Sequence, residues 1–296
     1  MKKHKICKIL LVILAIFLCV AFYELLGICV AYKKQPEVSN TTKKETKNES
    51  WNECSENTER AVIIEKNPEA LLQRVRLIKN AKKEIILSTF AFQSDESGKL
   101  ILGALHDAAD RGVHIRLLVD GMESWIDMEG NPYFYGLSSH ENVEIKLYNK
   151  ANPLKPWKMM GRMHDKYLIA DGKRYILGGR NTYNYFLGDF PGHKNYDRDV
   201  LVVCDEPEKE NSVNQLSEYF ETIWEQEDSG YFHDNKKPAN RKSVKNAVLE
   251  LQNSYQKYFE ENKERICETD YTDETFETEK ITLVSNHIHT GSKEPV

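Results

Sequence analysis

The sequence has few cysteines and no repeated motif, and both shortages narrow the class of protein. Six cysteines occur in 296 residues, and none forms a C-x-x-C pair or a spacing typical of metal ligands. Three of the six lie outside the apolar N-terminus, so the pattern makes no disulfide framework and leaves the cellular compartment open. No long-period internal repeat and no second H-x-K are present.

A surplus of basic charge is also missing. The net charge is −5, and residues 205–228 hold nine carboxylates against Lys209 alone. Proteins that bind nucleic acid usually carry a basic stripe that neutralises phosphates. This distribution weighs against a nuclease, and we expect no nucleic acid partner.

A long apolar run is present at the N-terminus. Residues 1–8 are basic, and residues 9–32 are apolar except for Glu24. As a helix, residues 9–32 would be about 36 Å long, enough to cross a hydrocarbon core of about 30 Å. A cleaved signal peptide would have a shorter apolar stretch and a better small-x-small site. We predict one uncleaved anchor in the cell membrane, with the catalytic part outside the cytoplasm.

The remaining chain predicts a polar linker at 33–60, an α/β domain at 61–235, and a helical segment at 236–296 that begins an incomplete second half. Residues 84–92 and 114–120 read as strands joined by a helix at 98–111, so they should be parallel. We expect a mixed, largely parallel sheet flanked by helices. The other predicted helices are 67–81, 206–226 and 240–263, and the other strands are 143–148, 199–204 and 281–285.

Residues 163–181, MHDKYLIADGKRYILGGRN, are the most informative stretch. His164 and Lys166 are two residues apart, so an extended strand projects both to one face. Asp171 and Gly172 predict a hairpin turn, after which residues 175–177 return as the partner strand.

The glycine pair that follows is expected to bring further polar groups to the same rim. Gly178 and Gly179 let the backbone turn sharply and approach a ligand closely, which would place Arg180 and Asn181 beside His164. An imidazole, an ammonium and a carboxamide on one rim suit attack on a phosphoryl group and the clamping of its oxygens.

Residues 152–160, NPLKPWKMM, predict a loop because of their two prolines. Eight lysines and arginines lie between residues 146 and 174, against Asp165 and Asp171. Two interpretations stay open. The loop is either a solvated connection that packs its tryptophan, or a basic rim with apolar tips that meets anionic head groups at a bilayer.

The spacing H-x-K-x4-D followed by G-G-x-N resembles the motif of the phospholipase D superfamily, over roughly residues 68–226. Within it, residues 90–121, 161–181 and 196–199 are most similar to the bacterial cardiolipin synthase branch. Members of that branch usually carry two motifs in two facing α/β halves, whereas this chain has one. Its last ten residues look like the entry to a second half, which suggests a truncated or split gene product.

The resemblance implies phosphodiester exchange through a covalent phosphohistidine, with no metal or other cofactor. His164 would be the nucleophile, and Lys166 and Asn181 would stabilise charge on the phosphoryl oxygens. Asp197 would fix the imidazole tautomer, with Asp199 as the alternative. Asp171 belongs to the catalytic motif, although it is expected to order the hairpin. The implied substrate contacts are Gly178, Gly179, Arg180 and Asp199.

A single motif provides a single histidine, so the chain lacks the acid that would protonate the leaving group. A homodimer or a second chain must supply another histidine. The resulting hypothesis is a membrane-anchored phosphatidyltransferase of cardiolipin synthase type, acting on anionic phospholipid. The alternatives are a phosphodiesterase or nuclease of the same superfamily, and a catalytically silent half-domain that binds lipid or a partner chain.

Overall fold

The computed structural model describes residues 2–33, 59–204, 206, 211–232 and 238–285. These residues fall into two compact units. One unit holds the long helix α1 (Lys2–Lys33) together with residues 151–162, which include the short 3-10 helix η1 (Pro156–Lys158). The other unit holds the remaining described residues and contains the sheet.

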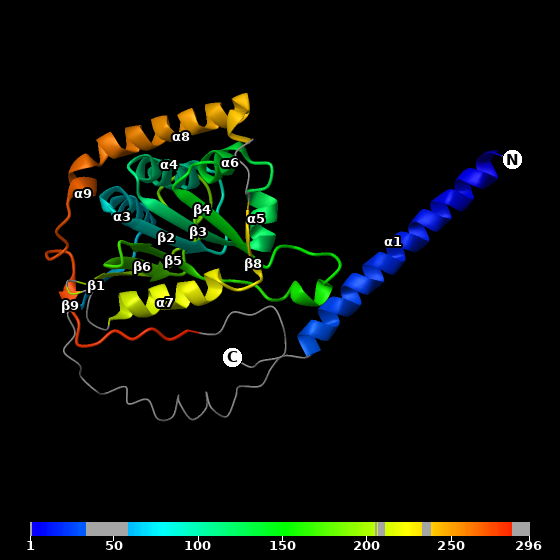
Figure 1. Cartoon of the computed structure of the whole chain (residues 1–296), viewed down its shortest axis with the longest axis horizontal. Helices are drawn as coiled ribbons and strands as arrows, with labels where there is room; N and C mark the ends of the chain where they lie inside the picture. The colour runs from blue at the N-terminus through cyan, green and yellow to red at the C-terminus, as the bar shows by residue number, and fades with distance from the viewer. Residues whose placement is uncertain (1, 34–58, 205, 207–210, 233–237, 286–296) are drawn as a thin grey trace. The chain divides into compact units, whose positions relative to one another are not determined.

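In the described residues, nine strands form one sheet in the order β8-β4-β3-β2-β5-β6-β7-β1-β9 (Figure 1). The mixed sheet is confirmed, but parallel pairing is confined to β2–β3 and β3–β4, less than predicted. All other neighbours run antiparallel. The bounds are β1 (Glu59–Ile64), β2 (Glu84–Thr89), β3 (His114–Asp120), β4 (Val143–Tyr148), β5 (Lys166–Ala170), β6 (Arg174–Gly178), β7 (Asp199–Cys204), β8 (Ser229–Tyr231) and β9 (Phe276–Glu277).

Helices cover both faces of the sheet (Figure 1). α3 (Asn67–Asn80), α4 (Glu96–Asp110) and α6 (Pro132–Ser138) lie on one face, and α7 (Ser212–Trp224) lies on the other. α8 (Lys242–Glu261) packs outside α4 and α6. The close approach of α8 requires a glycine, because a Cβ on Gly103 of α4 would stand 2.6 Å from the carbonyl oxygen of Leu251.

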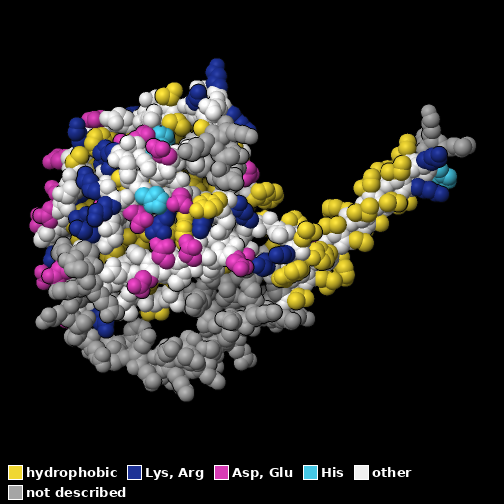
Figure 2. Space-filling view, in the orientation of Figure 1, with side chains coloured by type: hydrophobic (Ala, Val, Ile, Leu, Met, Phe, Trp, Pro, Cys, Tyr) yellow, Lys and Arg dark blue, Asp and Glu magenta, His cyan; other side chains and the backbone are white. Residues whose placement is uncertain are grey.

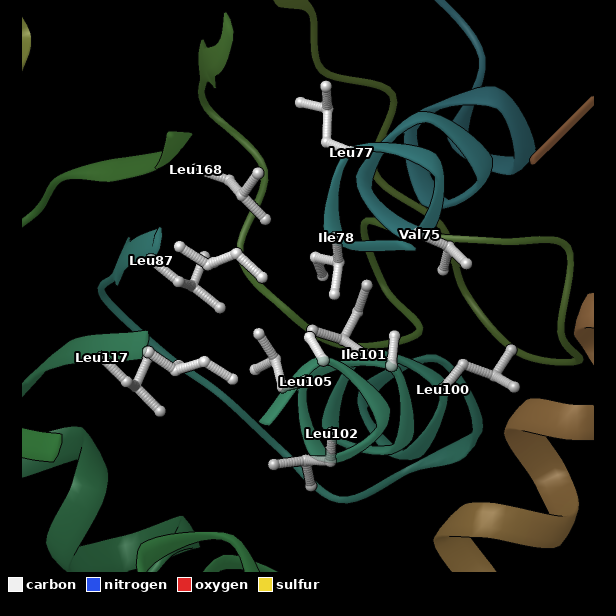
Figure 3. Close-up of a cluster of buried hydrophobic side chains, with 14 of the residues drawn as sticks. Val75, Leu77, Ile78, Leu87, Leu100, Ile101, Leu102, Leu105, Leu117 and Leu168 are labelled. Carbon is white, nitrogen blue, oxygen red and sulfur yellow. The ribbon is translucent and has the colours of Figure 1, made fainter. Parts of the chain in front are cut away.

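The main core lies between α3, α4 and the sheet (Figure 3). Leu87, Leu117 and Leu168 come from β2, β3 and β5, and all are buried. They meet Ile78 of α3 and Leu105 of α4. Each such leucine contributes roughly 1.5–3 kcal/mol by leaving water. This packing fixes the strands whose ends carry the candidate site.

Several elements differ from the sequence-based expectations. β1 begins inside the predicted linker, whose residues 34–58 lie outside the described part of the chain, as do the last residues, 286–296. Residues 281–285 are not a strand. Residues 238–285 of the predicted C-terminal segment lie in the sheet unit: α8 packs on α4, α9 (Lys263–Cys267) contacts α3, and β9 pairs with β1. The last ten residues, which look like the entry to a second half, lie outside the described residues.

Candidate active site

The predicted site residues other than Asp171 gather at one edge of the sheet. Lys166, the first residue of β5, lies opposite Thr89, the last residue of β2. Gly178 at the end of β6 lies opposite Asp199 at the start of β7. The antiparallel β2–β5–β6–β7 run therefore brings the ends of four strands, and the segments that continue from them, to the same edge.

The hairpin inside the motif is confirmed. β5 and β6 pair antiparallel, with Leu168 opposite Ile176. Asp171 and Gly172 both take positive φ, 55° and 62°, and Lys173 N donates to the Ala170 oxygen at 3.0 Å. Two successive left-handed residues match the twist of the flanking strands, which explains the Asp-Gly sequence.

His164 precedes β5 and is exposed. Its ring meets the Phe90 ring edge-to-face at a centroid distance of 4.7 Å. Its carbonyl oxygen accepts a hydrogen bond of 2.7 Å from Lys166 Nζ. The imidazole is thus accessible to a ligand while both its ring and its backbone are held in place.

The residue before the histidine is clamped from two strands. Met163 is fully buried, and its amide donates to Asp120 Oδ2 at 3.1 Å. Its sulfur accepts from Ser88 Oγ at 3.5 Å. Asp120 also accepts from the amides of Met122 and Glu123, and so caps α5 (Gly121–Asp127). One carboxylate therefore joins β3, α5 and the segment that carries His164.

Lys166 is 6% exposed, although it lies at the rim of the sheet. Burial lowers the pKa of its ammonium to about 8, and the neighbouring carboxylates of Asp165 and Asp197 oppose this shift. A lysine with this pKa can both bind an anion and lose its proton near neutral pH.

Asn181 lies just past the glycine pair and is also buried. Its Oδ1 accepts from the amide of Ala91 at 3.3 Å. Burial raises the pKa of the Tyr183 hydroxyl, and a hydrogen bond with Asn181 partly offsets this rise. The carboxamide is thereby oriented with its oxygen toward backbone at the end of β2.

Gly178 and Gly179 make room for two aspartates that pack against them. A Cβ on Gly179 would overlap the Asp197 carboxylate, and one on Gly178 would overlap Asp199. Asp197 accepts from the amide of Arg198 at 2.8 Å. The glycines therefore admit carboxylates, whereas their expected role was close contact with a ligand.

Arg180 and Asp199 form a buried ion pair, and the charged parts of both side chains have no solvent exposure. Asp199 Oδ2 lies 3.2 Å from Arg180 and 2.9 Å from Arg74 of α3. Arg180 also donates to the carbonyls of Ile64 and Glu65. This network ties α3, β1 and β7 together, so contact of either side chain with substrate, as predicted, would require it to leave these partners.

Asp171 lies at the opposite end of β5 from Lys166, about 16 Å away along the strand. Its carboxylate accepts from the amides of Lys82, Lys83 and Glu84. It therefore ties the hairpin turn to the start of β2. Grouping Asp171 with the catalytic residues conflicts with this position, whereas the expectation that it orders the hairpin agrees with it.

Sequence reasoning missed three contributors to the site: Phe90, Asp120 and Asp165. Asp165 accepts from the Tyr219 hydroxyl of α7 at 2.9 Å, and burial raises the pKa of Asp165. The C-terminal position of Asp120 on a buried strand was the available signal for its role. In the described part of the chain, no three His, Cys, Asp or Glu side chains gather as metal ligands.

Comparison with known proteins places this site in a family. A family model described as "Cardiolipin synthase, PLD-like domain" matches residues 74–224, just over half of the chain. The chain belongs to this phospholipase D-like family.

Individual relatives match over parts of their length. Cardiolipin synthase C of Escherichia coli K12 is 29% identical over 171 residues, which cover 53% of this chain and 34% of that protein. Cardiolipin synthase 1 of Staphylococcus aureus MRSA252 is 34% identical over 117 residues, which cover 39% of this chain and 23% of that protein. Phosphatidylserine synthase of Haemophilus influenzae superposes with a TM-score of 0.48 and 16% identity, covering 68% of this chain and 44% of that one. The chain therefore spans about a third or less of these two cardiolipin synthases.

Proposed function

We propose that this protein is a membrane-anchored phosphatidyltransferase of cardiolipin synthase type that works through a phosphohistidine. The observation that carries the proposal is the accessible His164 at one sheet edge, where the buried Lys166 donates to its carbonyl oxygen. The buried Asn181 accepts from Ala91, next to the Phe90 that the His164 ring contacts. Donors that are fixed before the reaction stabilise charge that develops in the transition state. The family match supports phosphodiester chemistry at this site.

In the first step, a nitrogen of His164 attacks phosphorus in an anionic phospholipid, and the donor alkoxide leaves with a proton from an acid. In the second step, the hydroxyl of another lipid attacks the phosphohistidine and releases His164, and the conjugate base of that acid takes the hydroxyl proton. Lys166 and Asn181 hold the non-bridging oxygens, and Asp197 orients the imidazole. The Arg180–Asp199 pair and the glycine pair keep Asp197 and Asn181 in position.

The acid comes from outside this motif. The chain has one H-x-K, so His164 of the partner subunit, or a second chain, supplies the proton. The sheet unit, proposed as the catalytic part, works at the cell membrane outside the cytoplasm. α1 is the anchor, since His4–Val30 is long and apolar enough to cross a bilayer by length and composition.

The test uses the full chain reconstituted in vesicles that contain phosphatidylglycerol, with cardiolipin formation followed by mass spectrometry. We expect His164→Ala to lower the rate by at least about 10³-fold, because loss of a nucleophile removes the whole covalent route. His114→Ala, at the far end of β3, is the matched control and should keep wild-type activity. Denaturation at alkaline pH should trap a phosphatidyl group on His164 in the wild type, because the phosphorus–nitrogen bond hydrolyses in acid.

Two results would replace the proposal. Equal cardiolipin formation with and without His164 would favour the silent lipid- or partner-binding half-domain. Cleavage of single-stranded DNA that depends on His164, without any lipid product, would favour the nuclease alternative.

A further inference from the structure

Residues 151–162 pack against the C-terminal third of α1. The Tyr23 hydroxyl donates to the Leu154 carbonyl oxygen at 2.9 Å. The ring of Pro156 lies so close to Gly27 that a Cβ there would overlap it. Ala21, Glu24 and Gly27 are partly covered, whereas most α1 side chains are exposed, so one stripe of the helix faces this loop.

The loop exposes large apolar side chains next to positive charge. Leu154 is 78% exposed, Met160 54% and Trp157 45%, whereas Pro156 between them is buried. Lys155 and Lys158 alternate with these apolar residues. The exposed apolar side chains of the loop extend the apolar surface of α1. Figure 2 shows that surface as hydrophobic side chains along the helix. Apolar tips with lysines between them complement a lipid surface that carries anionic head groups.

The length of α1 sets the depth of the contact. From Lys8 to Val30, α1 rises about 33 Å, close to the thickness of a hydrocarbon core. If Lys8 marks one membrane surface, a hydrocarbon core of about 30 Å ends near residue 28, about one helical turn past Glu24. Tyr23 and Glu24 then lie within about 8 Å of that boundary, so the tyrosine hydroxyl and the carboxylate can extend toward the interface.

We infer that residues 151–162 are a membrane-contact loop that inserts Leu154, Trp157 and Met160 into the bilayer interface beside α1, with Lys155 and Lys158 among anionic head groups. The inference rests on the proposed membrane anchoring by α1. It selects the lipid-facing interpretation of NPLKPWKMM over the solvated loop, because the loop is packed on the segment of α1 that reaches the interface. The chain reaches His164 four residues after Met160, so the contact would hold the motif near its lipid substrate.

The test is quenching of tryptophan fluorescence by lipids brominated near the head group, with the full chain in vesicles of mixed phosphatidylglycerol and phosphatidylcholine. We expect Trp157→Phe to remove more than half of the quenched signal. Trp125→Phe is the matched control: Trp125 is 65% exposed on α5 of the other unit, and its replacement should leave the quenching unchanged. Equal quenching in wild type and Trp157→Phe overturns the inference.

The contribution of the two loop lysines is tested with a separate double variant. Quenching of Trp157 should rise about twofold as the phosphatidylglycerol fraction increases, and Lys155→Gln with Lys158→Gln should abolish that rise. Lys82→Gln with Lys83→Gln, an exposed pair before β2, should keep it. A rise of equal size in both double variants overturns the assignment of the two loop lysines.

Neither readout needs turnover, so the inference and the proposed function can fail separately. Alkaline extraction tests the anchor: release of the wild-type chain from the vesicles overturns both the anchor and this loop contact. A chain that stays in the membrane with an unquenched Trp157 overturns the loop contact alone. Quenching of Trp157 in a chain that makes no cardiolipin supports the contact and counts against the proposed activity.

Discussion

At the scale of single residues, the ammonium group of Lys166 links burial to the expected pH dependence of the reaction. Its surroundings remove water from the charge, and the pKa falls because desolvation outweighs the attraction of Asp165 and Asp197. The protonated form is the one that can hold a phosphoryl oxygen. The charged clamp is therefore present below pH 8 and is lost as the pH rises through about 8.

We predict that kcat/KM for lipid exchange declines above about pH 8. Lys166→Arg should move this alkaline limb upward by more than about one pH unit, because a guanidinium stays protonated throughout that range. The maximal rate should fall, since arginine does not reproduce the point-like contact of an ammonium. The measurement is a pH–rate profile of both proteins from pH 6 to 10. An unchanged alkaline limb in the variant would assign that limb to another group.

At the scale of elements, two aspartates perform the same local task at opposite ends of β5. Asp120 accepts three backbone amides, from Met122, Glu123 and Met163. Asp171 also accepts three, from Lys82, Lys83 and Glu84. Only the first group includes the residue that precedes His164. Variants at Asp120 and Asp171 therefore distinguish an effect on the stability of a junction from an effect on the position of His164.

We predict that Asp120→Ser and Asp171→Ser each lower the free energy of unfolding by about 1–2 kcal/mol, measured by denaturant titration. Asp120→Ser keeps a residue suited to cap α5 and loses the reach to Met163. It should lower kcat by about 10–100-fold with little change in KM, because small displacements of a reacting group are costly. Asp171→Ser should keep wild-type kcat. Equal kcat values for the two variants would contradict a positioning role for Asp120.

The sequence predicted the long elements of the sheet unit because periodicity and turn chemistry agree there. α3, the parallel β2–β3 pair and the β5–β6 hairpin all follow from local pattern. α5 and α6 were missed because seven residues are too few to show a helical period. They are specified by their caps, Asp120 and Asn131, whose carboxylate and amide oxygens accept the first amides. β1 was missed because it follows a polar run and depends on pairing with β7.

The site was predictable as a set of residues, and only in part as a set of roles. The spacing of His164, Lys166 and Asn181 predicted their common edge. Burial decided the other roles: Arg180 lies within the motif and Asp199 begins β7, yet their charges pair inside the protein. Nothing in a linear pattern distinguishes an arginine that faces a ligand from one that holds three elements together.

At the scale of the whole molecule, the single motif makes activity depend on how many subunits contribute a histidine to one reaction centre. If two copies of His164 share one reaction centre, then a subunit without the histidine should inactivate its partner. We predict that mixing wild type with an excess of His164→Ala before reconstitution lowers the activity per wild-type subunit in proportion to the wild-type fraction. Mixing with Asp171→Ser is the control and should leave that activity unchanged. Constant activity per wild-type subunit in the His164→Ala mixture would contradict a shared centre.

The pairing of β9 with β1 has a consequence for handling the protein. β1 lies between β7 and β9, and Arg60 beside this edge donates to Thr275 and pairs with Glu277. A chain cut before residue 262 would lose β9 and leave the main-chain groups of β1 facing water along one side. Such an unpaired edge accepts strands from other copies, so shortened forms should precipitate or form fibres on concentration. Fragments made for crystallisation or spectroscopy should therefore extend at least through residue 285.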